Sequence, residues 1–94
     1  MNELIISVND EKLSHFSEYV KAFQKDTMAD CEELKYAIRK LKSNSSDQEI
    51  YESERMVDKI VDIIADAQPT ITQLSKKIDE YVALVRRLKA VARS

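Results

Sequence analysis

The sequence has no glycine and no tryptophan, and only one proline, one cysteine and one histidine among its 94 residues. The lack of glycine argues against tight hairpin turns and phosphate-cradling loops, because both rely on the backbone freedom of glycine. Runs of β-formers bounded by turn residues are missing as well. Charged residues make up 34% of the chain, which is typical of long helices when it accompanies a repeating apolar pattern. We therefore expect an all-α fold.

The residues that carry most enzyme and metal chemistry are equally scarce. His15 is the single histidine, and a metal site or catalytic triad would need further ligands or partners. Cys31 has no internal disulfide partner and lies on an apolar stripe, so we interpret it as a small buried hydrophobe. The paired carboxylates at residues 32–33 and 79–80 suit a solvated helix face. We predict no enzymatic activity and no cofactor or metal.

The charge balance and the apolar runs bear on partners and location. A net charge of −2 provides no field that favours nucleic acid, although the basic residues 86–93 leave a minor nucleic-acid role open. These bases have no interleaved aromatics and suit the C-terminal end of a helix. No apolar run approaches the roughly 20 residues of a membrane span. Residues 1–7 lack the basic start of a signal peptide. We expect a protein that is cytoplasmic on synthesis, with export without a cleavable signal peptide left open.

Polar residues mark where two helices begin. Asn9 precedes two acids, which is typical of a helix start, because asparagine caps free amides and early acids suit the helix dipole. Residues 43–47 are the only cluster of small polar residues and predict a loop. Ser46 and Glu49 have the spacing of a capping box that would begin the second helix.

Pro69 falls inside an otherwise continuous helical pattern, which predicts a kink in the helix and not a break. We therefore predict a single helical-hairpin domain over residues 1–94. Its first helix spans about 10–43, its loop 43–47, and its second helix about 48–92.

Apolar and small residues recur at spacings of three and four along both predicted helices, which indicates one packed face on each. In the first helix an extra step of four around Thr27 resembles a stutter in a heptad repeat. Folding the chain at residues 45 and 46 brings both stripes together in one antiparallel register, and the charges at the helix ends favour this direction. The predicted hairpin seam comprises Leu13, Phe16, Val20, Phe23, Leu34, Ile38, Leu41, Val57, Ile60, Ile64, Ile71, Leu74 and Ile78.

The second helix carries more apolar residues than one partner helix can cover. Two helices share one seam, and a chain of this length buries a small core. The surplus residues predict a second contact surface, and the simplest assembly is a four-helix bundle made by a dimer of hairpins. The predicted partner interface comprises Met56, Val61, Ile63, Val82, Leu84 and Val91.

The order of elements resembles a known family. An extended start at residues 5–13, a helix, a short polar loop and a longer helix in under 100 residues resemble the Esx-like (WXG) family, the small helical-hairpin proteins of bacterial type VII secretion. The family's Trp-x-Gly loop motif corresponds here to residues 45–47, which are Ser-Ser-Asp. Its Tyr-x-x-x-Asp/Glu export signal is absent, since Val85 stands four residues after Tyr81. The resemblance implies homodimers or heterodimers in four-helix bundles, with export through a signal-bearing partner or a role as targeting chaperone for a larger secreted protein.

Two hypotheses for function remain at this stage. The first is a protein-binding helical hairpin of the type VII secretion kind, acting as a small secreted partner or as a targeting chaperone. The second is a cytosolic structural or regulatory coiled-coil module unrelated to secretion. Both predict a protein partner that docks on a helix face, either a second copy or another helical hairpin.

Overall fold

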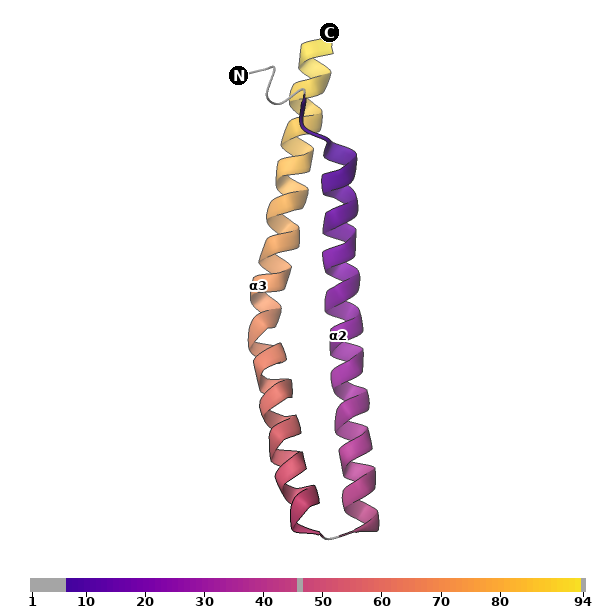
Figure 1. Cartoon of the computed structure of the whole chain (residues 1–94). Helices are drawn as coiled ribbons and strands as arrows, with labels where there is room; N and C mark the ends of the chain where they lie inside the picture. Colours follow the sequence, from indigo (N-terminus) through magenta and orange to yellow (C-terminus); the bar gives the residue numbers. More distant parts are fainter. Residues whose placement is uncertain (1–6, 46, 94) are drawn as a thin grey trace. The chain divides into compact units, whose positions relative to one another are not determined.

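The computed structural model describes residues 7–45 and 47–93, and two long helices account for almost all of them. Helix α2 spans Asp10–Asn44 and helix α3 spans Gln48–Arg93 (Figure 1). Over the described residues the chain contains no strand, so the all-α prediction is confirmed. Both helices begin and end within one residue of the predicted bounds.

Local polar side chains explain where each helix begins. The Lys12 backbone amide donates a hydrogen bond of 2.9 Å to Oδ1 of Asn9, which is the N-cap predicted for α2. The corresponding cap of α3 is Asp47, whose Oδ1 accepts a 2.9 Å hydrogen bond from the amide of Glu49. The predicted capping box involves Ser46, which lies outside the described residues.

Helix α3 continues through Pro69 without interruption. Proline lacks the amide that would donate to the preceding turn, and its ring crowds the carbonyl four residues earlier. The predicted continuity of the helix is therefore confirmed, while the predicted kink stays a prediction.

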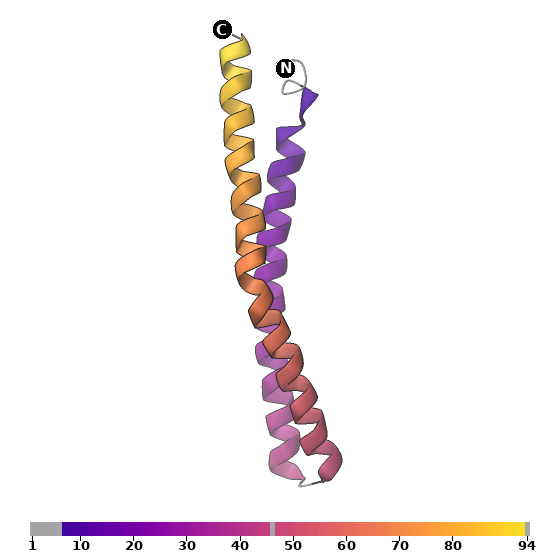
Figure 2. The same ribbon diagram turned by 90° about the vertical axis from the view of Figure 1, so that its left-hand side faces the viewer.

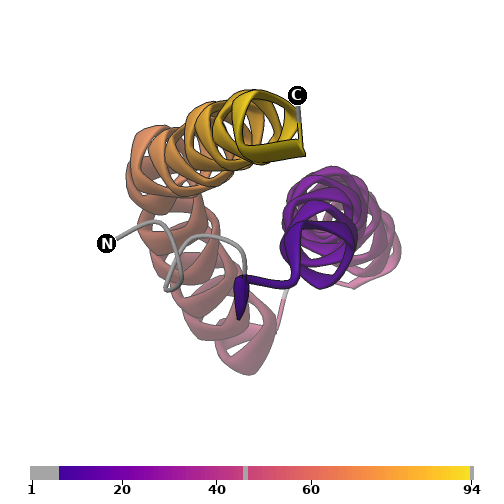
Figure 3. The ribbon, with the colours of Figure 1, turned by 90° about the horizontal axis from the view of Figure 1, so that it is seen from above.

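The contacts divide the chain into two compact units. The single domain predicted from the sequence stays a prediction. Unit 1 combines residues 1–22 with 70–94, and unit 2 is residues 23–69. In unit 1 the first turns of α2 lie beside the last turns of α3 (Figures 1 and 3). Asp10 contacts Arg86, and Ser17 contacts Ser75 further along. The two segments therefore run antiparallel in this unit.

Unit 2 contains the end of α2, the connection and the start of α3 (Figure 2). At one end Nε2 of Gln24 donates to the carbonyl oxygen of Gln68, and near the connection Lys42 pairs with Glu54. The two helical segments are therefore antiparallel in this unit as well.

The core of each unit is thin. The buried apolar residues are Val20, Val82 and Val85 in unit 1, and Cys31, Ile38 and Val57 in unit 2. Burying one such side chain contributes roughly 1.5–3 kcal/mol, while ordering each residue costs roughly 1–2 kcal/mol in backbone entropy alone. Many larger apolar side chains stay outside these cores, and their positions define the candidate site.

Candidate protein-binding surface

Inward-facing residues recur every seven positions along both helices, so each helix can be described by heptads with positions a to g. The a and d positions are those that face the opposite helix. In α2, the a positions are Asp10, Ser17, Gln24, Cys31 and Ile38, and the inward d positions are Leu13, Val20 and Thr27. In α3, the a positions are Glu54, Val61, Gln68, Ser75, Val82 and Lys89, and the d positions are Val57, Ile64, Ile71, Ile78 and Val85. All of these residues are buried or half-buried.

Several residues predicted in the seam are exposed instead, and this corrects the predicted orientation of the helices. The exposed fractions are 49% for Phe16, 52% for Phe23, 46% for Ile60 and 45% for Leu74. All four occupy g positions, next to the seam. The residues that follow three of them, at 17, 24 and 75, are polar a residues that face inward. The sequence-based prediction placed the apolar g residues in the seam, in preference to the polar a residues beside them, because it expected mainly apolar residues there.

Most polar groups of these seam residues are paired, although Oε1 of Gln68 is buried and has no hydrogen-bond partner among the described residues. Ser75 Oγ donates to the carbonyl of Thr72, and Nε2 of Gln68 donates to the carbonyl of Ile64 at 2.9 Å. A buried polar group without a partner costs free energy, and these local bonds avoid most of that cost. The heptad positions also explain the predicted stutter at Thr27. The predicted stripe joined g and d positions before Thr27 and d and a positions after it, so the extra step arose from this change of positions and not from the helix itself.

The other predicted seam residues lie at a or d positions. Val20, Ile38 and Val57 are buried, whereas Leu34 and Leu41 are exposed. The remaining four are half-buried and comprise Leu13, Ile64, Ile71 and Ile78.

The predicted partner interface divides into two groups. Val82 is only 5% exposed and Val61 is half-buried, so both face the opposite helix at a positions and do not form an outer surface. The other four occupy c positions and are exposed, namely Met56, Ile63, Leu84 and Val91.

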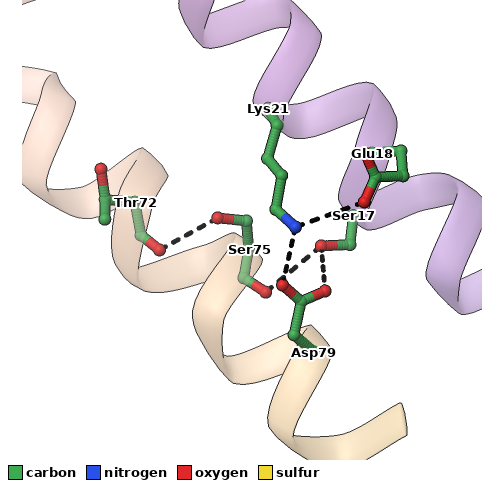
Figure 4. Close-up of polar contacts among 6 residues, drawn as sticks. All are labelled: Ser17, Glu18, Lys21, Thr72, Ser75 and Asp79. Atoms are coloured by element: carbon green, nitrogen blue, oxygen red, sulfur yellow. Dashed lines mark hydrogen bonds and ion pairs between the residues drawn. The ribbon is translucent and has the colours of Figure 1, made fainter.

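A polar network closes one edge of unit 1, the edge at which the e positions of the two helices meet (Figure 4). Lys21 pairs with Asp79 across the helices at 2.8 Å and with Glu18 on its own helix at 3.3 Å. Hydrogen bonding to Asp79, and then to Glu18, raises the pKa of Lys21. Hydrogen bonds from Lys21, and then from Ser17, lower the pKa of Asp79. Both charged forms are therefore favoured at neutral pH.

Ser17 connects this network to the core, and it is fully buried. Its Oγ donates to Oδ1 of Asp79 and also lies 3.3 Å from the carbonyl oxygen of Ser75 (Figure 4). A hydroxyl has one proton, so the shorter contact with the carboxylate takes it. The sequence analysis missed this network, but polar residues at heptad spacing, such as Asp10, Ser17 and Gln24, are the signal that could have found it.

A second polar cluster closes the end of unit 1. Asp10 accepts from Nζ of Lys89 at 2.7 Å and from Nε of Arg86 at 2.9 Å. Lys89 also donates to the carbonyl oxygen of Val8 at 2.6 Å. Hydrogen bonds from Lys89, and then from Arg86, hold the pKa of Asp10 well below its ordinary value. The basic C-terminal residues are thus partly engaged within the chain.

The corresponding edge of unit 2 is mixed. Lys42 contacts Glu54 at 3.1 Å, and its Nζ lies 5.2 Å from the centre of the Tyr51 ring. Met28, at an e position of the same edge, is 52% exposed. Cys31 is a buried free thiol, as predicted, and lines a small pocket together with Val61, Ile64 and other residues. Across residues 7–45 and 47–93, no group of three or more potential ligand side chains is arranged to hold a metal ion.

The opposite edge of each unit carries exposed apolar side chains at g and c positions, because the e positions occupy the closed edge. We call these the apolar flanks. The apolar flank of unit 1 comprises Phe16, Tyr19, Leu74, Tyr81, Leu84, Leu88 and Val91. The apolar flank of unit 2 comprises Phe23, Met56, Ile60 and Ile63.

The apolar positions of the flanks go beyond those of a two-stranded coiled coil. A two-stranded coiled coil needs apolar residues at a and d only, whereas a helix in a bundle adds e or g to form a wider face. Here the added positions are g and c, and several a positions are polar. The face that is richest in large apolar residues therefore lies beside the seam.

No family model, curated protein or solved structure matches this chain. Within the part of the chain that the structure describes, neither helix has a segment with the length and apolarity needed to cross a bilayer.

Proposed function

We propose that this chain is a non-catalytic protein-binding module that docks another helical pair on its apolar flanks and so completes a four-helix bundle. The observation that carries the proposal is the one-sided distribution of large exposed side chains in unit 1, with residues such as Phe16, Leu74 and Leu84 on one edge and ion pairs on the other. Contiguous exposed apolar surface of this kind is typical of protein interaction sites. Docking would bury it, while the polar edge would stay in water.

The architectural resemblance to Esx-like proteins supports a more specific form of the proposal. In this form the chain is a small partner, or a targeting chaperone, in type VII secretion, and it leaves the cell with a partner that bears the export signal. The alternative is a cytosolic structural or regulatory coiled-coil module. Export that stops when the secretion ATPase is deleted distinguishes the first form, because the cellular distribution of a cytosolic module would not change.

The docking proposal is tested by removing apolar groups from one flank. Leu74 and Leu84 belong to the flank of unit 1, and the double variant Leu74→Ser, Leu84→Ser should lose the native complex. The matched control is Tyr36→Ser, because Tyr36 is 68% exposed at an f position, outside both flanks and in the other unit from Leu74 and Leu84. The measurement is the particle mass of each tagged chain in extract of the native cell, by gel filtration, with helicity checked by circular dichroism.

The expected result is a complex for the wild type and the Tyr36→Ser control, and a helical single chain for the double variant. A wild-type chain that elutes alone, or a double variant that keeps the full complex, would contradict the proposal.

A further inference from the structure

The apolar flanks of the two units carry opposite charge. At g and c positions, the flank of unit 1 includes Lys12 and Lys77 and no acid. The corresponding positions of unit 2 include Asp26, Asp30, Glu33 and Glu49 with one base, Lys40. All seven side chains are exposed.

These flank charges have no ionic partner within the described residues. None of the seven forms an ion pair there, whereas Lys21 and Lys42 at e positions are each paired across the helices. The charges of Lys21 and Lys42 are therefore paired within the chain, whereas the charges beside the two apolar flanks are not. The unpaired charges are mainly basic on unit 1 and mainly acidic on unit 2. Charges arranged around an apolar patch steer a partner and select its orientation.

We infer that the apolar flank of unit 1 binds the apolar flank of unit 2 in a second copy of this chain. The inference rests on the proposed docking function and names its partner. Pairing two unit 1 flanks would bring lysines together, and pairing two unit 2 flanks would bring carboxylates together. Only the mixed pairing sets Lys12 and Lys77 against Asp26, Asp30 and Glu33, and like charges disfavour the others.

Charge reversal tests this pairing because all the side chains involved are exposed. The first variant is Lys12→Glu, Lys77→Glu, and the second is Asp26→Lys, Asp30→Lys, Glu33→Lys. Each variant alone should dimerise at least tenfold more weakly than the wild type, since both flanks then carry one sign. An equimolar mixture should restore a tight dimer that contains one copy of each variant.

The measurements are native mass spectrometry and sedimentation equilibrium of the purified full chain. The mixture also controls for folding, because a misfolded variant would not be rescued by its partner. The matched control is Lys76→Glu, Arg87→Glu, which reverses two exposed bases of unit 1 outside the g and c positions. It should dimerise like the wild type.

Three results would overturn the inference: a purified wild type that stays monomeric, reversed variants that dimerise as tightly as the wild type, or a mixture that gains nothing. A monomeric purified chain would leave the docking proposal intact if the wild type still forms a complex in native extract and the Leu74→Ser, Leu84→Ser variant does not. The two failures are therefore distinguishable.

Discussion

The serine pair of unit 1 shows how single residues set the orientation of both helices. Ser17 and Ser75 face each other at a positions, and both are buried. Their small side chains suit close approach of the two backbones, and Asp79 takes the Ser17 proton. With these residues inside, the large neighbours Phe16 and Leu74 are held outside. The polar a residues are therefore what leaves the apolar flank available.

The charges of the same network make stability depend on pH. The lowered pKa of Asp79 means that its contribution is present above the unfolded value of about 4 and is lost as the pH falls through the folded value. Asp10 has the same sign of effect. The raised pKa of Lys21 adds a contribution that is present below about 10.4 and lost as the pH rises through its folded value.

We therefore expect the urea midpoint of the wild type to decrease as the pH is lowered below about 4. The variant Asp79→Asn should have a lower midpoint at pH 7 and a smaller decrease in acid, because one depressed carboxyl is gone. Asp10 accounts for the decrease that remains. The measurement is urea denaturation followed by circular dichroism between pH 7 and pH 2. Identical acid profiles for the two proteins would contradict the assigned role of Asp79.

At the scale of the helices, Pro69 is unusual because it lies in the interior of a long helix. It lies inside α3, where proline costs roughly 3 kcal/mol relative to alanine. We expect Pro69→Ala to stabilise the chain by about 1–3 kcal/mol, because the new amide can donate to the preceding turn. Thermal melting is the measurement, and Thr70→Ala at the next exposed position is the control, with a change of at most about 0.7 kcal/mol. An unchanged or lower stability for Pro69→Ala would show that the proline conformation is needed.

The helices themselves were predictable from sequence because their signals are local. Asn9 marks the start of α2 through a hydrogen bond to the amide of Lys12, only three positions further along the chain. The apolar periodicity is a second signal, and it repeats over many turns. The rotation of each helix about its axis was not predictable in the same way. It depends on bonds between residues far apart in the chain, such as Gln24 with the Gln68 carbonyl and Ser17 with Asp79. A rule that places apolar residues inside cannot anticipate these pairs.

The candidate binding surface was likewise predictable in part from the sequence. The surplus of apolar residues on α3 was visible in the sequence, and Met56, Ile63 and Leu84 are indeed exposed. Val61 and Val82 were assigned to the same surface, but the structure turns both toward α2. Apolar character alone does not separate the two faces of a helix that has polar residues in its seam. The polar pairing that separates them needed the structure.

At the scale of the whole molecule, the account depends on a protein covering the apolar flanks. Each unit has a thin core and a wide exposed apolar edge, which is an unfavourable arrangement for a chain that remains alone in water. The ion pairs on the opposite edge contribute little to stability, since exposed pairs are typically worth about 0–1 kcal/mol each. In unit 1 they do, however, mark the edge that we expect to stay solvated.

The most direct test is the reactivity of a thiol placed on the flank of unit 1. In a Cys31→Ser background, Leu84→Cys puts a thiol at an exposed c position, and Ala83→Cys puts one at the exposed b position, about 100° around the helix and outside the flank. Labelling with a maleimide is measured in native cell extract and in unfolding conditions. We predict that the thiol introduced by Leu84→Cys reacts much more slowly in native extract than the one introduced by Ala83→Cys, with equal rates after unfolding. Equal and rapid labelling of both thiols in native extract would contradict the account.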